Sequence, residues 1–336
     1  MGSGSSIRQA APIYLVGGSR AQSGGPPNRQ NVHGEDVNEA RTEERMVVPF
    51  GTPATRPAGR ALTLFSQFCL FCVLCLAAGA LQAQPVRQDE LDPWADALVT
   101  DRPHFTESPV SVAPGRLQLE GGYTFSRLDA ERSHTVGELL ARIGALDRLE
   151  FRLGLNSFVF RSEPDSGDAP VNQNRSLRGL EDVTLGLKVE VLRPPPSKPG
   201  LPQLGILAGT TIPTGRSEIG SAGLQPGAIL AAGWDLTEWL SAGMNVGYAY
   251  PEDEDGRFDE LSGSLALGFG LTERLGAFAE WYGIYPLPSD KGDENNANAG
   301  VTYLLSPGFQ LDARVGVGLG GPRPNFFIGA GAAWRI

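Results

Sequence analysis

Three cysteines are the residues of this chain whose type and spacing come nearest to a metal or redox site. Cys69, Cys72 and Cys75 recur at every third position within residues 62–80, a run that contains no charged side chain. A structural zinc site needs four ligands, together with polar neighbours that orient them. The run offers no fourth ligand, so we predict neither a metal nor a cofactor for this chain.

Two further motifs have the composition of a ligand site but the wrong surroundings. Residues 316–321 spell GxGxxG, yet Pro322 and Pro324 follow where a dinucleotide site needs a helix. That context favours strand glycines and a loop. Residues 252–255 are all carboxylates, but their spacing is not that of a calcium loop. We interpret them as a solvated loop, and a bound divalent cation is the alternative.

Ser133 and His134 are adjacent, which suggests a hydrolase acting on lipid. A nucleophile and its base must face one another, with a third group that orients the base. Adjacency in the sequence does not establish that arrangement. We therefore predict that the chain is not an enzyme and has no catalytic residues.

Ionisable side chains within otherwise apolar segments form the set that we expect to matter most. They alternate with apolar residues, so each points to the face opposite its apolar neighbours. Because buried charges must be hydrated or paired, they form either a salt-bridged network that stiffens a closed barrel or the lining of a narrow water-filled path. The candidates for lining one common interior are Glu120, Arg142, Arg152, Lys188, Glu190, Glu280, Asp312 and Arg314.

A period of two runs through the segments that must hold these charges in place. Residues 183–191, for example, alternate between apolar side chains and Thr, Gly, Lys or Glu. Strict alternation places every apolar side chain on one face of a strand. Such a sheet is either a soluble sandwich with its apolar faces packed together or a membrane barrel with its apolar face in lipid.

Three features favour the membrane barrel. A secretory signal precedes the strands, tight turns such as 144–149, 233–240 and 270–275 alternate with longer connections, and the last strand is apolar at alternate positions up to Ile336. We predict an all-β fold, an up-and-down antiparallel transmembrane β-barrel of about 12 strands. An even number of strands lets both chain ends lie on one side.

The predicted strands end within a few residues of the turns that separate them. We expect long extracellular connections at 128–134, 161–180, 214–224, 251–257, 286–297 and 319–324, and short turns, with residues 193–202, on the periplasmic side. The strands are predicted at 116–127, 135–143, 149–160, 181–192, 203–213, 225–235, 240–250, 258–270, 275–285, 298–305, 309–318 and 325–335.

The first part of the chain divides into segments outside the barrel, which we place at residues 116–336. Residues 1–45 lack periodicity and predict a disordered extension, and Met46 is a candidate for the true start. Residues 46–83 are typical of a signal peptide, with cleavage after Ala83; a retained transmembrane anchor is the alternative. Residues 84–115 are predicted to be a linker and a segment at the periplasmic mouth.

Residues 100–109 read Thr-Asp-Arg-Pro-His-Phe-Thr-Glu-Ser-Pro, and residues 114–123 read Pro-Gly-Arg-Leu-Gln-Leu-Glu-Gly-Gly-Tyr. These motifs resemble the start of the outer-membrane β-barrel family of phenol-degradation meta-pathway transporter-like proteins. Residues 179–188 and 212–215 resemble the family more weakly. The resemblance covers roughly residues 98–336. His104 departs from the family pattern, which has Asp there. The resemblance implies a location in the bacterial outer membrane and a transport role.

Residues 100–115 contain three prolines and are therefore not a strand of the wall. We expect this segment to fold into the periplasmic mouth of the barrel. Its candidate site residues are Asp101, Arg102 and Glu107, and we expect Arg102 and Glu107 to pair with charges of the lumen.

The formal net charge of −10 argues against nucleic acid as a partner, because phosphate contacts need clustered Lys and Arg. The expected partners are outer-membrane lipids, the barrel assembly machinery and a small-molecule solute. We predict a channel or transporter-like barrel for the passive passage of small molecules, hydrophobic or aromatic ones among them. A non-conducting structural or adhesive barrel is the main alternative, and a lipid-modifying barrel enzyme is the lesser one.

Overall fold

A computed structural model of the chain describes residues 98–336, apart from 165–173, 196–199, 217, 222, 254, 288–290 and 321–323. The predicted extension (1–45), the signal peptide (46–83) and the first part of the linker lie outside the described residues. Among the residues that are described, no helix is long and apolar enough to span a membrane.

Strands account for most of the described chain. Their sequences alternate between apolar residues and polar residues or glycine, as the two faces of a strand require. In chain order they are β1 (Leu117–Leu128), β2 (Glu131–Leu146), β3 (Leu149–Pro164), β4 (Asn174–Leu180), β5 (Val183–Leu192), β6 (Gln203–Ile212), β7 (Gln225–Asp235), β8 (Leu240–Ala249), β9 (Glu252–Asp253), β10 (Gly256–Arg257), β11 (Glu260–Gly270), β12 (Leu275–Pro286), β13 (Glu294–Ser306), β14 (Phe309–Gly320) and β15 (Phe326–Arg335).

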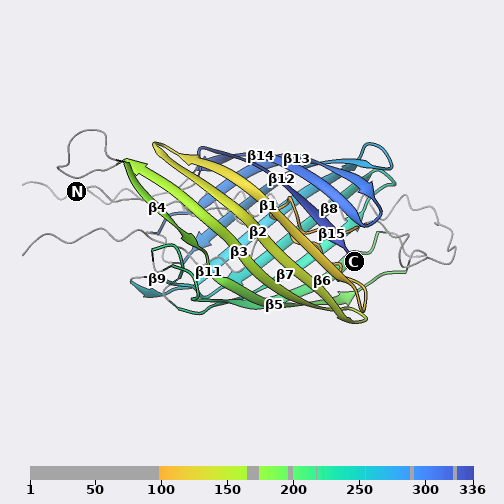
Figure 1. The fold of residues 1–336 in the computed structure, drawn as a ribbon. Helices are drawn as coiled ribbons and strands as arrows, with labels where there is room; N and C mark the ends of the chain where they lie inside the picture. Colours follow the sequence, from red (N-terminus) through yellow and green to blue (C-terminus); the bar gives the residue numbers. More distant parts are fainter. Residues whose placement is uncertain are drawn as a thin grey trace, which may run out of the picture. The chain divides into compact units, whose positions relative to one another are not determined.

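All of these strands except β9 and β10 form one antiparallel sheet that closes on itself (Figure 1). β1 pairs with β15 on one side and with β2 on the other, and the pairing of β2 with β3 completes the ring. β3 pairs with β5 along its first half and with β4 along its second half. Because β4 and β5 are thus two halves of one wall strand, the 13 strands of the sheet make a closed barrel of 12, which confirms the predicted fold class.

The wall has its apolar face outside and its polar face inside. On β5, Leu187 and Val189 are 40% and 41% exposed, whereas Lys188 between them is fully buried. A soluble protein would turn these faces the other way, because exposed apolar area costs free energy in water. Lipid as the outer solvent reverses the preference.

One end of the barrel holds tight turns and the meeting point of the first and last strands. Leu117 and Ile336 exchange two backbone N–H···O bonds there, of 3.1 and 2.7 Å. Only residues 147–148 join β2 to β3, and Arg148 takes a positive φ of 67° in that turn. The opposite end carries the β3–β4 and β9–β10 hairpins (Figure 1).

Several of the predicted long connections contain more strand than expected. Asp129 and Ala130 alone join β1 to β2, so the prediction of a long connection at 128–134 is wrong. β3 and β4 extend into 161–180 from both ends, β13 begins inside 286–297, and β9 and β10 lie within 251–257. These extensions lack the row of apolar residues that marks a lipid-facing strand, so the sequence pattern does not distinguish them from loops.

Candidate functional site

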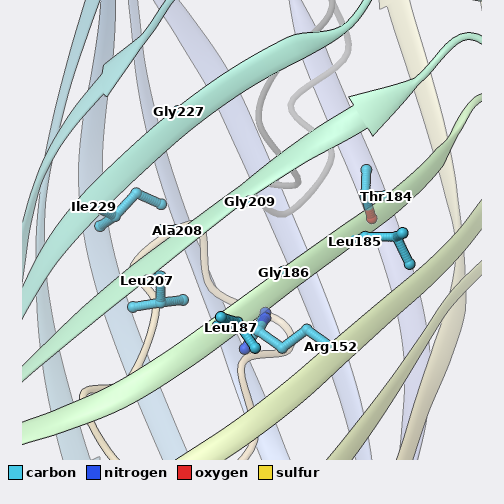
Figure 2. A pocket seen from close by; sticks show the side chains of 10 residues that line it. All are labelled: Arg152, Thr184, Leu185, Gly186, Leu187, Leu207, Ala208, Gly209, Gly227 and Ile229. Carbon is cyan, nitrogen blue, oxygen red and sulfur yellow. The ribbon is translucent and has the colours of Figure 1, made fainter.

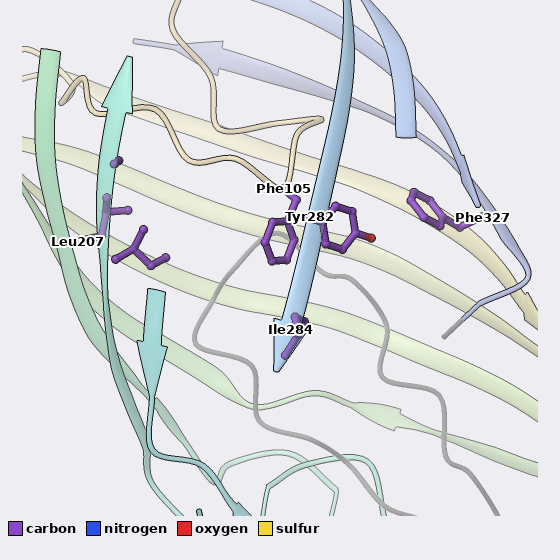
Figure 3. Close-up of a cluster of buried hydrophobic side chains, with 7 residues drawn as sticks. Phe105, Leu207, Tyr282, Ile284 and Phe327 are labelled. Atoms are coloured by element: carbon purple, nitrogen blue, oxygen red, sulfur yellow. The ribbon is translucent and has the colours of Figure 1, made fainter. Parts of the chain in front are cut away.

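The described residues that precede β1 lie inside the barrel. Residues 98–116, which we call the plug, precede β1 and lie among the inward-facing side chains of the wall; Figure 3 shows part of this segment beside Phe105. Asp101, Arg102 and Glu107 are each 2% exposed. Gly115 N donates to Gly144 O (2.8 Å), so the plug enters at the end of the barrel where β1 begins.

Asp101 lies at the centre of three cations from three different strands. Its carboxylate is 2.5 Å from Arg152 Nη1, 3.0 Å from Lys188 Nζ and 3.1 Å from Arg142 Nη1. These cations stand on β3, β5 and β2, and the closed ring brings them to one place. Buried like charges repel one another, so a shared carboxylate is what allows them to lie together.

Further carboxylates surround the same cations. Arg142 pairs with Glu120 at 3.1 Å and with Glu150 at 2.8 Å, and Arg152 pairs with Glu107 at 3.1 Å. Removing one member of a buried pair leaves an uncompensated charge and costs about 3–5 kcal/mol. The cluster therefore fixes the position of the plug against β1, β2, β3 and β5.

Arg102 anchors the plug to the other side of the ring. Its guanidinium pairs with Glu138 on β2 and lies 3.4 Å from Asp312 on β14. Arg314, also on β14, donates through Nη1 to the carbonyl oxygen of Pro103 at 3.0 Å. The plug is thus held across the closure of the barrel as well as along one wall.

Wall carboxylates also accept hydrogen bonds from the backbone of the plug. Glu280 accepts from Phe105 N (2.9 Å) and Thr106 N. Glu120 accepts from Asp101 N and Arg102 N, Glu150 from Val112 N, and Glu190 from Ser111 N. A segment without strand partners must satisfy its buried N–H groups elsewhere, and the inward-facing acids do this.

Burial and charge act in opposite directions on the two carboxyl groups of the plug. Burial alone would raise the pKa of Asp101, but Arg142, Lys188 and Arg152 outweigh it and hold that pKa well below its usual value. For Glu107, burial prevails over the attraction of Arg152 and raises the pKa to about 8. At neutral pH Asp101 is therefore ionised.

Glycines of the wall allow the plug to approach closely. A Cβ at Gly205 would lie 2.7 Å from the carbonyl oxygen of Pro109, and a Cβ at Gly144 would overlap the backbone of Ala113. Real Cβ atoms do not come so near to backbone atoms, so any larger residue at these positions would displace the plug.

Gly144→Ala is expected to displace the plug without removing a charge. The new methyl group would overlap the carbonyl groups of Val112 and Ala113. Overpacking of this kind costs about 1–3 kcal/mol, or roughly a fivefold to hundredfold larger displaced population. Recordings in a planar bilayer should then show more frequent or larger openings than wild type.

The matched control is Gly263→Ala on β11, whose Cβ would be 3.8 Å from the nearest atom, Asn245 O. It should conduct as wild type does. Equal conductance of the wild type, Gly144→Ala and Gly263→Ala would contradict the close seating of the plug.

The tip of the plug is apolar. The ring of Phe105 stacks on that of Tyr282, with centroids 4.0 Å apart and planes at 10°. His104 packs edge-on against Phe278, with centroids 4.1 Å apart. The wall residues that complete the cluster around Phe105 and Tyr282 are Leu207, Ile229, Ala231, Ile284 and Phe327 (Figure 3).

A small cavity lies against β5, β6 and β7 (Figure 2). The register aligns Gly186 with Gly209 and Gly209 with Gly227, and this row of glycines leaves space beside Arg152. The volume is about 40 Å³, which holds only a few water molecules. It is too small for an aromatic solute. Within the part of the chain that is described, no group of His, Cys, Asp or Glu is arranged to hold a metal ion.

All eight of the predicted interior residues point into the barrel, and none is more than 8% exposed. Each makes a hydrogen bond or an ion pair with the plug. The sequence prediction missed Glu138 and Glu150. Glu150 follows the alternation and could have been included, whereas Glu138 lies in a bulge that breaks the alternation.

The sequence matches the model of one protein family. The family model described as "Putative MetA-pathway of phenol degradation" matches residues 100–336, which are most of the plug and the whole wall. No curated protein matches the chain.

Several solved structures are similar to this chain at low sequence identity, and the first of them shares its fold. An outer membrane channel from Pseudomonas putida F1 has a TM-score of 0.50 and 14% identity, and the match covers 74% of this chain and 100% of that one. The NanC porin has a TM-score of 0.43 and 10% identity, over 65% of this chain and 98% of the porin. The KdgM porin has a TM-score of 0.41 and 9% identity, over the same shares.

Proposed function

The chain belongs to the family described as "Putative MetA-pathway of phenol degradation", and from that premise we propose that it is a bacterial outer-membrane channel for small molecules, apolar and aromatic ones among them. The observation that carries this proposal is the closed wall with an apolar outside and a charged inside, occupied by a segment of the same chain. Because this occupant is not a strand of the wall, its movement would open a path without breaking the barrel.

The proposed solute class is supported by the apolar cluster inside the barrel. Phe105, Tyr282 and Phe327 lie together in this cluster, among the charged side chains of the lumen. An aromatic solute could replace Phe105 on the face of Tyr282 with similar offset stacking. Passage is passive in this proposal, and the plug sets how often the path is open.

The proposed location predicts how the purified protein behaves. Folded protein should resist SDS until it is boiled and then change its migration, because a closed barrel has no free edge from which to unfold. In a planar bilayer it should give small, discrete conductance steps. In intact cells, its expression should speed the uptake of N-phenylnaphthylamine, an apolar aromatic dye that outer membranes exclude, relative to an empty vector. A freely water-soluble protein, or dye uptake equal to the empty vector, would overturn the proposal.

Ser133 and His134, the candidate catalytic pair, lie on opposite faces of the wall. Ser133 is fully buried inside the barrel, whereas His134 lies on the outer face with its Nδ1 2.8 Å from the hydroxyl oxygen of Tyr123. Adjacent residues of a strand point to opposite faces, so this serine and this histidine do not face one another. We propose that the chain is not an enzyme.

A non-conducting barrel is the second candidate, and the density of charge pairs around the plug favours it. The acidic loop offers less to an adhesive role, because Arg257 pairs with Glu252 at 2.8 Å and Lys291 with Asp253 at 2.7 Å. Bilayer recordings of the intact protein decide between the two candidates, since a structural barrel does not open while its plug is present.

A further inference from the structure

Three arginines lie on the outer face of neighbouring strands near one end of the barrel. The tight turns and the paired chain ends mark the periplasmic end, because outer-membrane barrels have short turns there and longer loops outside. The opposite, extracellular end holds the β1–β2 and β3–β4 hairpins, and Figure 1 shows these four strands side by side. Near this end Arg127, Arg132 and Arg178 are exposed, whereas the residues that precede Arg127 and Arg178 and follow Arg132 are buried in the lumen. The three arginines therefore point away from the lumen.

The sheet register places these arginines in one area. Arg127 of β1 is the direct partner of Arg132 of β2. On β3, Phe160 pairs with His134 of β2 on one side and with Arg178 of β4 on the other. Arg178 is thus two strands away from Arg132 and one step of two residues nearer the membrane, a separation of about 12 Å. A headgroup with several anionic oxygens can contact long side chains at that spacing.

The opposed pair of arginines has no counter-ion of its own. Like charges directly opposite one another destabilise an antiparallel pair. In the lumen, neighbouring arginines share carboxylates, but no carboxylate of the described residues pairs with Arg127, Arg132 or Arg178. Arg127 Nε donates to the carbonyl oxygen of Asp129 at 2.9 Å, which orients the side chain without neutralising it. An anion from outside the chain fits this arrangement.

Other exposed arginines described at the extracellular end differ in this respect. Arg216 pairs with Glu218 at 2.8 Å, and Arg257 pairs with Glu252 at 2.8 Å. The net charge of the chain is −10, so acidic partners are not scarce. The positive charge left on the outer face of β1, β2 and β4 is therefore a local feature of that face.

An aromatic layer begins on the membrane side of the opposed arginines. The ring centroids of Phe125 and His134 are 5.0 Å apart, and those of Tyr123 and His134 are 6.0 Å apart. On β3, Phe160 is 46% exposed and its ring lies 4.8 Å from that of Phe158. Aromatic girdles of outer-membrane barrels mark the boundary between hydrocarbon and headgroups. The arginines therefore stand at the level of the outer-leaflet headgroups.

We propose that the outer face of β1, β2 and β4 binds a phosphorylated lipid headgroup of the outer leaflet, with Arg127, Arg132 and Arg178 on its phosphate groups and the aromatic layer against its acyl chains. A guanidinium donates two parallel hydrogen bonds to a phosphate, which suits arginine to this ligand. The bound lipid neutralises the opposed pair and holds the two hairpins together from outside. This inference needs the outer-membrane location and does not depend on conduction.

Titration of the folded protein with diphosphoryl lipid A tests the site. Native mass spectrometry from a non-ionic detergent measures the fraction of barrels that retain the lipid. A basic residue near an anionic headgroup contributes roughly a fivefold factor in affinity. The combined change Arg127→Gln, Arg132→Gln and Arg178→Gln should therefore raise the lipid concentration at half-occupancy by roughly a hundredfold, and Arg132→Gln alone by about fivefold. Lipid A without phosphate groups should bind the wild type as weakly as diphosphoryl lipid A binds the triple variant.

The matched control is Arg274→Gln, because Arg274 is an exposed arginine in the turn between β11 and β12 at the periplasmic end. It should bind diphosphoryl lipid A as the wild type does, and the heat-dependent shift in SDS verifies that each variant is folded. Equal affinity of the wild type and the folded triple variant, or equal affinity of the wild type for the two lipids, would overturn the site. Displacement of the lipid by millimolar inorganic phosphate would show a site for free anions and would overturn it as well.

Discussion

Deletion of residues 100–110 is expected to raise single-channel conductance several-fold above wild type. The deleted residues carry Asp101, Arg102, Phe105 and Glu107, which make most of the contacts between plug and wall. Without them, Arg142 and its neighbours face water and become hydrated. A wall of 12 strands lies between about eight strands, which side chains fill, and sixteen, which leave an aqueous channel. Planar-bilayer recording at fixed salt measures the change.

The matched control deletes residues 86–96, a stretch of the same length that precedes the plug. It should leave conductance at the wild-type level. If deletion of residues 100–110 also left conductance unchanged in a barrel that still shows the heat-dependent shift in SDS, the plug would not be the barrier and the non-conducting alternative would gain support.

Asp101→Ala is expected to release the plug through a single change of charge. Arg142, Arg152 and Lys188 would lose the carboxylate that they share. Loss of one partner from such a buried group costs about 3–5 kcal/mol, which is more than about a hundredfold in the ratio of docked to released plug. Openings in a planar bilayer should become long-lived, and a maleimide should label Ser108→Cys faster in this background.

Glu238→Gln is the control for this change, because Glu238 is an exposed carboxylate in the turn between β7 and β8. It should conduct and label as wild type does. Asp101→Asn keeps hydrogen-bonding atoms but loses the charge, so it should lie between wild type and Asp101→Ala. Labelling of Ser108→Cys at one rate in all backgrounds would contradict the role of Asp101.

The pH dependence gives an independent check on Asp101. Because the pKa of this carboxyl is lowered in the folded protein, its contribution to docking is fully present above its ordinary value of about 3.9. The contribution is lost only as the pH falls through the lowered value. Acidification from neutral pH to about pH 5, which lies above both pKa values, should therefore leave the Asp101 anchor in place. Opening that tracked the ordinary pKa of an aspartate would contradict the charge cluster.

The wall could be predicted from the sequence because lipid on its outer face and the lumen on its inner face require different side chains at alternate positions. The run from Val183 to Leu192 is an example, since lipid selects Leu187 and Val189 while the lumen selects Lys188. The same rule explains the errors at strand ends. Around residues 131–134 the buried Glu131 and Ser133 alternate with the polar Arg132 and His134, so no apolar row distinguishes the strand that continues there from a loop.

The partners of the plug could be predicted only as a class. Prolines excluded residues 100–115 from the wall, and inward-facing charges offered counter-ions. Which charges meet depends on the closure of the ring, which brings Arg142, Arg152 and Lys188 onto one carboxylate. No local pattern carries that information. Glu138 was missed for a different reason, because the bulge after Gly137 breaks the period of two on which the prediction was based.

The position of the plug ahead of β1 sets the order of biogenesis. Residues 98–116 are synthesised before any wall strand, yet their partners include Glu280 on β12 and Arg314 on β14. These side chains reach their places only after β15 has joined β1. The plug can therefore complete its contacts only once the last strands are in place. A chain truncated before β15 would keep the charged partners on β2, β3 and β5 but lack the closed ring that brings them together around Asp101.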